Sequence, residues 1–331
     1  MPFSEKLISW HRREGRRGLP WQGTRDPYLI WLSEVMLQQT QVTAVIPYYE
    51  RFLRRFPTIG SLARADQGEV LKLWSGLGYY ARGRNLHAAA KEIVILGKFP
   101  DRAEDIEKLP GVGRSTAAAI AAFAFGERAA ILDGNVKRVL ARCFLMEDRK
   151  GLWALAESLL PKKDIETYTQ ALMDLGATVC TRGQPRCEIC PVSRSCLARK
   201  ENRIHELPRA RPKKVLPLKK ATWLLLVHKG KILLERRPSR GLWGGLLTFP
   251  ETAVKGCEIA SRRKLPVVEH GFTHFRLRAQ PILCEVRKIA SRKDFLWVSL
   301  KTAAQGAVPA PVRKILKGVR AVYSRRKSSR G

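Results

Sequence analysis

Two acidic side chains stand where they could work as an acid and an anion. Glu34 lies in the apolar stretch WLSEVML, residues 31–37, and a carboxyl group among apolar neighbours is costly to ionise. Burial would keep a proton on Glu34 near neutral pH, as a general acid requires. Asp133 precedes a predicted helix, whose N-terminus stabilises a capping carboxylate as the anion. Cleavage of a glycosidic bond needs such a pair. The same sequence is equally compatible with an exposed glutamate on an amphipathic helix and an aspartate that only caps a helix.

The stretch that contains Asp133 predicts two helices joined through glycine-rich loops. It opens with LPGVG at residues 109–113, where Gly111 and Gly113 leave backbone N–H groups bare before a helix expected over residues 115–125. Such groups suit a bound anion such as a phosphate. A second loop, residues 131–135, leads into a helix expected over residues 136–142. Taken alone, either loop would equally belong to an ordinary helical hairpin in a core.

Four of the seven cysteines lie close together, with six, two and five residues between them: Cys180, Cys187, Cys190 and Cys196. Four thiolates at this spacing would bind zinc or an iron–sulfur cluster. The odd total in a long basic chain argues against a disulfide framework. The remaining three are expected to be unligated: Cys143, Cys257 and Cys284.

The composition favours a polyanionic partner. The chain has 331 residues, with 62 Lys and Arg against 29 Asp and Glu, and hence a formal charge of +33. An excess of this size indicates nucleic acid or an anionic membrane surface. No apolar run is long enough to span a bilayer, and Trp10-His11-Arg12-Arg13 interrupts any signal-peptide core. We therefore expect an intracellular protein of the cytoplasm or nucleoid, a monomer that does not bind membranes.

The chain length predicts two domains. Residues 1–204 read as helical, and residues 205–220, with three prolines and many cations, read as a linker. The β-rich runs at residues 221–227 and 231–237, joined at Lys229-Gly230, predict a hairpin within an α+β domain over residues 221–323. Further strands are expected at residues 275–277, 282–286 and 295–298, and residues 324–331 should form a basic disordered tail.

Several longer motifs together resemble the MutY-type adenine DNA glycosylases. They are LPW at residues 19–21, WLSEVMLQQT at residues 31–40 and GLGYY at residues 76–80, and the match extends to Cys196. The resemblance implies a mainly α helix-hairpin-helix glycosylase domain and a target of double-stranded DNA with adenine opposite 8-oxoguanine. It also implies that Glu34 protonates the adenine and that Asp133 stabilises the cationic sugar, with Ser115 and Asn135 supporting the catalytic site.

Ser115 also separates two kinds of glycosylase. Related lyases of the endonuclease III type carry a lysine at the matching position, which forms a Schiff base with the sugar. A serine cannot form that adduct, so a monofunctional enzyme that uses water is favoured. The alternatives are an endonuclease III-like glycosylase and lyase acting on damaged pyrimidines, or a non-catalytic iron–sulfur DNA-binding protein.

The resemblance also assigns residues that grip and open the duplex, since a base must be extruded before it can react. The DNA-binding candidates come from three motifs: Gln39, Tyr79, Gly111, Gly113, Lys137 and Arg138. Arg82 and Arg84 are further candidates for phosphate contacts, and Gln170 for a base-edge contact. Gln22 stands where some family members have arginine, which leaves its contact to the base open.

Two further assignments follow from the same resemblance. The four clustered cysteines match the ligands of a [4Fe–4S] cluster. The C-terminal domain resembles a Nudix-like domain, in which Phe272, Thr273 and His274 would recognise 8-oxoguanine. Residues 251–264 lack the closely spaced carboxylates that hold Mg²⁺ in Nudix hydrolases, so we expect the fold without that hydrolase activity.

Overall fold

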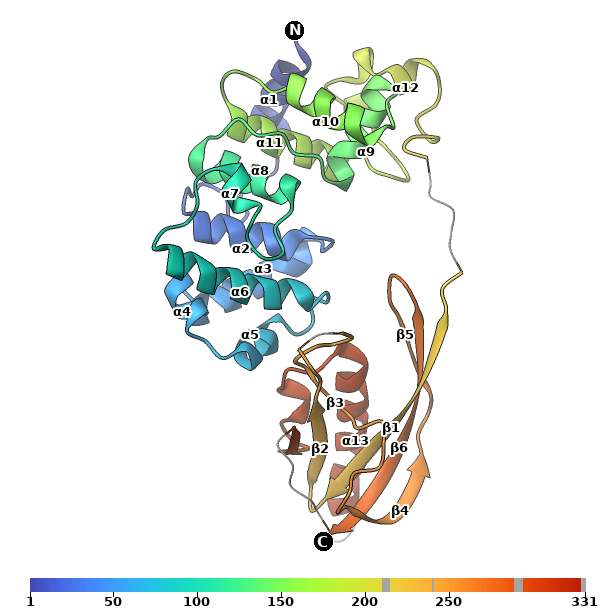
Figure 1. The fold of residues 1–331 in the computed structure, drawn as a ribbon. Helices are drawn as coiled ribbons and strands as arrows, with labels where there is room; N and C mark the ends of the chain where they lie inside the picture. The colour runs from blue at the N-terminus through green and yellow to red at the C-terminus, as the bar shows by residue number, and fades with distance from the viewer. Residues whose placement is uncertain (210–214, 240, 289–293, 329–331) are drawn as a thin grey trace. The chain divides into compact units, whose positions relative to one another are not determined.

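The structure is a computed structural model that describes residues 1–209, 215–239, 241–288 and 294–328 (Figure 1). The chain forms two compact units. Residues 1–63 and 88–212 make up the first, and residues 64–87 and 213–331 make up the second. The domain limits expected from the sequence remain predictions, and part of the expected linker, residues 210–214, lies outside the described residues.

The first unit is helical, in agreement with the sequence (Figure 1). Its α-helices are α1 (Phe3–Glu14), α2 (Pro27–Leu37), α3 (Val42–Arg55), α4 (Ile59–Ala63), α7 (Ala103–Ile106), α8 (Arg114–Phe125), α9 (Gly134–Phe144), α10 (Arg149–Ser158), α11 (Ile165–Asp174) and α12 (Leu197–Lys200). A further helix, α6 (Ala81–Leu96), begins in the second unit and continues into the first. Among the described residues, a π-helix, η1 (Leu175–Val179), and two 3-10 helices, η2 (Cys187–Ile189) and η3 (Ser193–Ser195), complete the unit.

Local signals place most helix ends correctly. Pro27 occupies the first turn of α2, and the Asp26 side chain accepts a hydrogen bond from the Tyr28 backbone N–H. Gly126 ends α8 in the left-handed conformation, with φ of 71°. Two helices follow Asp26, because α2 ends at Leu37 and α3 begins at Val42.

Residues 38–41, between α2 and α3, form a turn in which Gln39 has φ of 58°. Pro47 lies inside α3. Because proline removes only its own backbone N–H from the ladder, tertiary packing can keep a helix intact through it. Val45 and Tyr49, on either side of the proline, are buried.

A shared apolar core fixes the helices that carry the site. Side chains of α1, α8, α9 and α11 meet in one buried cluster, which includes Leu7, Ala118, Val139 and Leu172. The alanines of α8 are almost all buried, and their small size lets neighbouring helices approach closely. As a result, residues of α1, α8, α9 and α11 that are far apart in the sequence are held in fixed positions relative to one another.

The described residues of the second unit form a mixed β-sheet and two α-helices apart from α6. Its strands are β1 (Leu218–His228), β2 (Lys231–Arg236), β3 (Leu247–Thr248), β4 (Glu258–Lys264), β5 (Val268–Gly271), β6 (Arg276–Lys288) and β7 (Phe295–Ser299). Its helices are α5 (Gln67–Trp74) and α13 (Ala310–Ser328), with the short turn η4 (Ala303–Gln305). The α+β character expected from the sequence is confirmed.

The sheet has the strand order β3-β2-β1-β6-β4, with β5 also paired to β6 and β7 to β2. The hairpin at Lys229-Gly230 is confirmed, since β1 and β2 pair antiparallel with His228 opposite Lys231. The central pair, β1 and β6, is parallel. Helix α13 packs on one face, where its Val312 and Leu316 meet Trp223 of β1 in a buried core (Figure 1).

Two features of this unit differ from expectation. The runs expected at residues 275–277 and 282–286 belong to one strand, β6, which continues through Pro281. Helix α13 extends to Ser328, across most of the segment expected to be disordered, and residues 329–331 lie outside the described residues. In the described part of the chain, no helix has the length and apolar character needed to cross a bilayer.

Candidate functional site

A cavity of about 260 Å³ opens in the first unit beside Glu34. Its walls come from α1, the loop that follows α1, α2, α8 and α11, and its lining residues include His11, Trp21, Gln22, Ser33, Glu34, Phe123 and Gln170. Aromatic rings, amide groups, basic side chains and the carboxyl groups of Glu34 and Glu166 surround the space. Such a mixture suits a flat heteroaromatic ligand with polar edges.

Burial of Glu34 beside this cavity determines its protonation state. The carboxyl group stands on α2 between Ser33 and Val35, both of which are buried. Burial raises the pKa of Glu34 to about 8, and the charge of Asp133 adds to that rise. Glu34 is therefore a neutral acid at pH 7 that can give a proton to a molecule in the cavity.

Asp133 meets the sequence expectation for its backbone setting. It caps α9, with Oδ1 accepting hydrogen bonds from the N–H groups of Asn135 and Val136, both at 2.8 Å. These two donors and the helix N-terminus stabilise negative charge on the carboxylate. Asp133 is not among the residues that line the cavity, but it lies close enough to Glu34 to raise the pKa of that group. The two carboxyl groups named from the sequence therefore lie near enough to interact electrostatically.

Ser115 and Asn135 support the loop that carries Asp133. Ser115 Oγ accepts a hydrogen bond of 3.0 Å from the Leu132 N–H, which ties the start of α8 to this loop. Asn135 Oδ1 accepts a hydrogen bond of 2.9 Å from Arg138. A Cβ on Gly176 would lie 2.7 Å from Asn135 Cβ, so the close approach of η1 to α9 requires glycine at that position.

Arg138 does not face outward, and its expected role as a DNA contact is wrong. Its guanidinium is buried and donates to the backbone carbonyls of Cys180 and Gly176, at 2.8 and 2.7 Å, as well as to Asn135. These bonds link α9 to η1 and to the cysteine loop. Lys137, the neighbouring candidate, is only half-buried and remains a predicted phosphate contact.

The glycine hairpin has the geometry that an anion site needs. Gly111 adopts φ of 77°, a conformation that favours glycine, and Gly113 is the N-cap of α8. No side chain caps the first turn of α8, so in this described segment its backbone N–H groups are left for solvent or a ligand. Arg114, beside them, pairs with Glu157 and lies over the ring of Trp153 at 4.0 Å.

Gln39 and Tyr79 both stand on strained, exposed turns. Gln39 is exposed in the turn between α2 and α3. Tyr79, in the second unit, is 47% exposed and has φ of 45°. Arg82 is buried instead of reaching phosphates, because its Nη2 donates to the carbonyls of Leu77 and Gly78 in the same turn. Its guanidinium also lies 5.5 Å from the Tyr79 ring centre and so supports the displayed aromatic ring.

The three lesion-recognition candidates lie together at the turn between β5 and β6. The backbone N–H of Phe272 donates to the carbonyl of Phe275, and the two rings stack with centres 4.3 Å apart. Thr273 and His274 occupy the exposed tip. This turn and Tyr79 line one groove of about 720 Å³ within the second unit. Arg84 also lines this groove, where its Nη1 donates to the carbonyl of Gly244, at 3.0 Å, instead of to a phosphate.

The four clustered cysteines line a single apolar pocket, to which Cys143 also contributes. The clustered thiols interact electrostatically: burial and, to a smaller extent, the other three of them raise the pKa of Cys190 to about 12. In the described residues no three His, Cys, Asp or Glu side chains converge closely enough to define a metal site. The set of four thiols in one apolar pocket nevertheless fits the donor preference of an iron–sulfur cluster or zinc.

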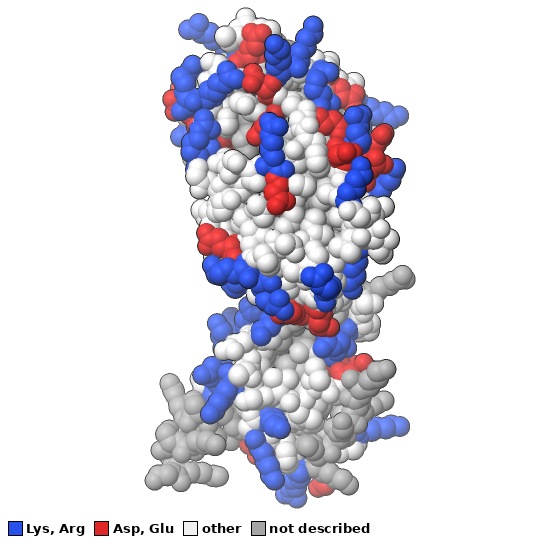
Figure 2. Space-filling view, turned by 90° about the vertical axis from the view of Figure 1, so that its left-hand side faces the viewer, with Lys and Arg blue, Asp and Glu red and all other residues white. Residues whose placement is uncertain are grey.

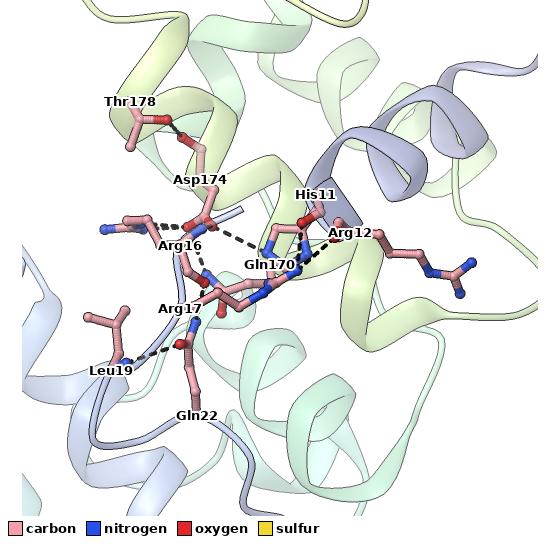
Figure 3. A network of polar contacts seen from close by, with 9 residues as sticks. All are labelled: His11, Arg12, Arg16, Arg17, Leu19, Gln22, Gln170, Asp174 and Thr178. Carbon is pink, nitrogen blue, oxygen red and sulfur yellow. Dashed lines mark hydrogen bonds and ion pairs between the residues drawn. The ribbon is translucent and has the colours of Figure 1, made fainter. Parts of the chain in front are cut away.

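Several residues of the site were not foreseen from the sequence (Figure 3). Asp174, at the end of α11, is 0% exposed and lies at the centre of a polar network. Its carboxylate interacts with His11, Arg16 and Gln170. Asp174 stands in the apolar stretch ALMDLG, so the reasoning that singled out Glu34 would have found it too.

Figure 2 shows one face on which blue Lys and Arg side chains clearly outnumber red Asp and Glu side chains. This agrees with the formal charge of +33 and favours long-range attraction of a polyanion.

Comparison with known protein families gives two matches. Residues 32–162 match the HhH-GPD superfamily of base excision DNA repair proteins, and residues 221–318 match the NUDIX domain. The adenine DNA glycosylase of Buchnera aphidicola subsp. Baizongia pistaciae is 37% identical over 340 residues, which cover 95% of each chain. Human adenine DNA glycosylase is 44% identical over 215 residues, which cover 60% of this chain and 39% of the human one.

Solved structures share the fold of the helical part. A thermostable thymine-DNA glycosylase superposes with a TM-score of 0.56 at 30% identity, over 60% of this chain and 95% of that one. Endonuclease III in a non-covalent complex with DNA gives a TM-score of 0.53 at 20% identity, over 60% and 94%. The helix-hairpin-helix glycosylase fold expected from the sequence is therefore confirmed.

Proposed function

Because the chain belongs to the adenine DNA glycosylase family, we propose that it hydrolyses the N-glycosidic bond of adenine opposite 8-oxoguanine or guanine in double-stranded DNA. The observation that carries this proposal is the cavity beside Glu34. Burial and the charge of Asp133 raise the pKa of the Glu34 carboxyl group to about 8, so the group can donate a proton at neutral pH. The reaction would start base excision repair and leave an abasic site. A chromosomal substrate would place the enzyme in the cytoplasm or nucleoid.

In this mechanism Glu34 is the general acid. An adenine turned out of the duplex enters the cavity, where the neutral carboxyl group protonates a ring nitrogen of the departing base. Protonation makes the base a better leaving group. After departure the Glu34 carboxylate can take a proton from the attacking water, which restores its starting state.

Asp133 supplies the fixed negative charge. As the glycosidic bond breaks, positive charge develops on the sugar, and a carboxylate held by two backbone N–H groups can stabilise it. Ser115 carries no amine and is engaged by the Leu132 N–H, which favours hydrolysis by water over Schiff-base chemistry. We therefore propose a monofunctional glycosylase that acts as a monomer.

The exposed turns would grip and open the DNA. The free N–H groups at Gly111 and Gly113 suit a phosphate, and Lys137 adds a cation to the same element. Tyr79 and Gln39 are displayed where they could fill the gap left by the extruded base. Phe272, Thr273 and His274 would read 8-oxoguanine in the groove that Tyr79 also lines.

We propose that Cys180, Cys187, Cys190 and Cys196 hold a [4Fe–4S] cluster, with zinc as the physical alternative. When bound, the cluster would supply a rigid cross-link of the loop and not chemistry at the base. Arg142 supports this loop by donating to the carbonyl of Thr181 at 2.8 Å and contacting Cys180 Sγ at 3.5 Å.

A cleavage assay with matched variants tests the function. Duplexes carrying adenine opposite 8-oxoguanine, guanine or thymine are incubated with the protein and then treated with alkali, which cuts at abasic sites. We expect cutting at adenine opposite 8-oxoguanine and guanine. Cutting confined to a thymine-glycol duplex, or strand cleavage without alkali, would instead support the endonuclease III-like alternative.

Two conservative variants separate the two carboxyl roles. Glu34→Gln should lower excision by roughly 100-fold or more and leave binding to the mismatched duplex intact. Asp133→Asn keeps a helix cap but loses the charge, so excision should fall by roughly 100-fold while the fold is kept. Near-normal turnover in either variant would remove that residue from the mechanism.

A further inference from the structure

The turn that displays Tyr79 is strained. Three of its residues have positive φ: Gly76 at 116°, Gly78 at 75° and Tyr79 at 45°. This conformation is costly for a residue with a Cβ, so it persists only where the surrounding structure fixes it. Trp74 Nε1 and Arg82 Nη2 both donate to the Gly78 carbonyl, at 3.2 and 3.4 Å. These bonds define the shape of the turn, whereas contacts outside the turn must define its place.

The place of the turn is set by the two residues that flank it, Ser75 and Tyr80, both of which are buried. Ser75 Oγ donates a hydrogen bond of 2.8 Å to the Val308 carbonyl, and Tyr80 Oη donates to the same carbonyl at 3.3 Å. Ala307 precedes this residue, and its carbonyl accepts a bond of 2.9 Å from the Leu247 N–H on β3. Both ends of the turn are therefore attached to a segment that is itself attached to the β-sheet.

Arg313, in the first turn of α13, clamps one of these ends. Its Nη1 donates to the backbone carbonyl of Ser75 at 3.3 Å, and its Nη2 donates to Ser75 Oγ. A planar guanidinium can thus fix a backbone atom and a side-chain atom of one residue at the same time. Because Ser75 Oγ accepts from Arg313, its own proton is left to bond the Val308 carbonyl.

We propose that Arg313 is a positioning residue for Tyr79. By holding Ser75 on the sheet unit, it keeps the Tyr79 ring in the groove that the turn of residues 272–274 also lines. This inference rests on the proposed adenine excision, in which the ring fills the gap left by the extruded base. With the clamp in place the ring is in position when the lesion binds. Without it the turn must be ordered in each encounter with DNA, which slows the reaction.

The test measures single-turnover excision of adenine opposite 8-oxoguanine in a double-mutant cycle of Arg313 and Tyr79. Arg313→Met loses both donors and should slow excision by about fivefold. In a protein that carries Tyr79→Ala, the same replacement should slow excision by less than about twofold, because no ring is left to position. Lys314→Met is the matched control: it removes an exposed cation from the next position of α13 and should keep the rate of its parent in both backgrounds.

Two conservative variants keep the test decisive if Arg313→Met does not fold. Arg313→Lys retains the charge but lacks the planar fork that holds both Ser75 oxygens, so excision should slow by about threefold. Tyr80→Phe removes only the hydroxyl group that bonds Val308 at the other end of the turn, and a similar slowing is expected. Both effects should disappear in the Tyr79→Ala background.

Equal slowing by the Arg313 variants with and without Tyr79 would indicate a general structural role and would overturn the proposal. Wild-type rates in folded Arg313→Met, or in Arg313→Lys and Tyr80→Phe together, would overturn it as well. A wild-type protein that does not excise adenine would refute the proposed function, and this inference with it. The two failures are distinct, because the second is seen in the wild-type rate alone.

Discussion

Replacing Glu34 by glutamine should stabilise the folded protein at neutral pH. The pKa of Glu34 rises from 4.5 to about 8 on folding, through burial and the charge of Asp133. Between these two pH values the Glu34 carboxyl group is therefore protonated in the folded state and ionised in the unfolded state. The stability associated with this group is complete below about pH 4.5 and is lost as the pH rises toward about 8. At pH 7 the pH lies about 2.5 units above the pKa of Glu34 in the unfolded chain. At about 1.4 kcal/mol per unit, Glu34 lowers the free energy of unfolding by roughly 3 kcal/mol.

Urea unfolding at several pH values between about 5 and 8 measures this cost. The free energy of unfolding of Glu34→Gln should exceed that of the wild type by an amount that grows as the pH rises. Glu92→Gln, which alters an exposed glutamate on α6, is the control and should follow the wild type. If the Glu34→Gln and wild-type curves stayed parallel across this range, Glu34 would ionise in the folded state as it does in the unfolded chain, and its role as a neutral acid would be refuted.

Three further outcomes are expected. Cys187→Ser should remove the brown colour expected of an iron–sulfur protein and lower the unfolding temperature; a colourless wild-type protein that contains zinc would contradict the cluster. Tyr79→Ala should slow adenine excision from duplex DNA by roughly tenfold or more, as loss of one stacked aromatic implies, and an unchanged rate would contradict insertion of the ring. Arg138→Met should lower the free energy of unfolding by about 1–3 kcal/mol. Lys137→Met should instead reduce the slope of log binding constant for DNA against log salt concentration by about one. A loss of salt dependence in Arg138→Met and a loss of stability in Lys137→Met would contradict the burial of Arg138.

Much of the site could be predicted because local chemistry determines it. Asp133 caps α9 and Gly126 ends α8, both through bonds within a few residues in the sequence. The apolar surroundings of Glu34 were visible in its own helix. Asp174, at the centre of the polar network, also lies in an apolar stretch at the end of its own helix, ALMDLG, so its burial is visible in the sequence as well.

Burial that depends on distant segments could not be read from the sequence. Arg138 resembles a surface cation in its own helix, but η1 and the cysteine loop supply the carbonyls that turn it inward. Strand β4 illustrates the same limit for secondary structure. Its sequence EIASRRK is polar and almost fully exposed, and it forms a strand because β6 offers an edge with which to pair.

The pH dependence of single-turnover adenine excision tests most directly the claim that a neutral Glu34 and an anionic Asp133 act on one extruded nucleoside. The rate on a duplex with adenine opposite 8-oxoguanine should be level near pH 7 and should fall as the pH rises through about 8, where Glu34 loses its proton. A rate that instead rises through this range, or stays constant across it, would contradict protonation of the base by Glu34.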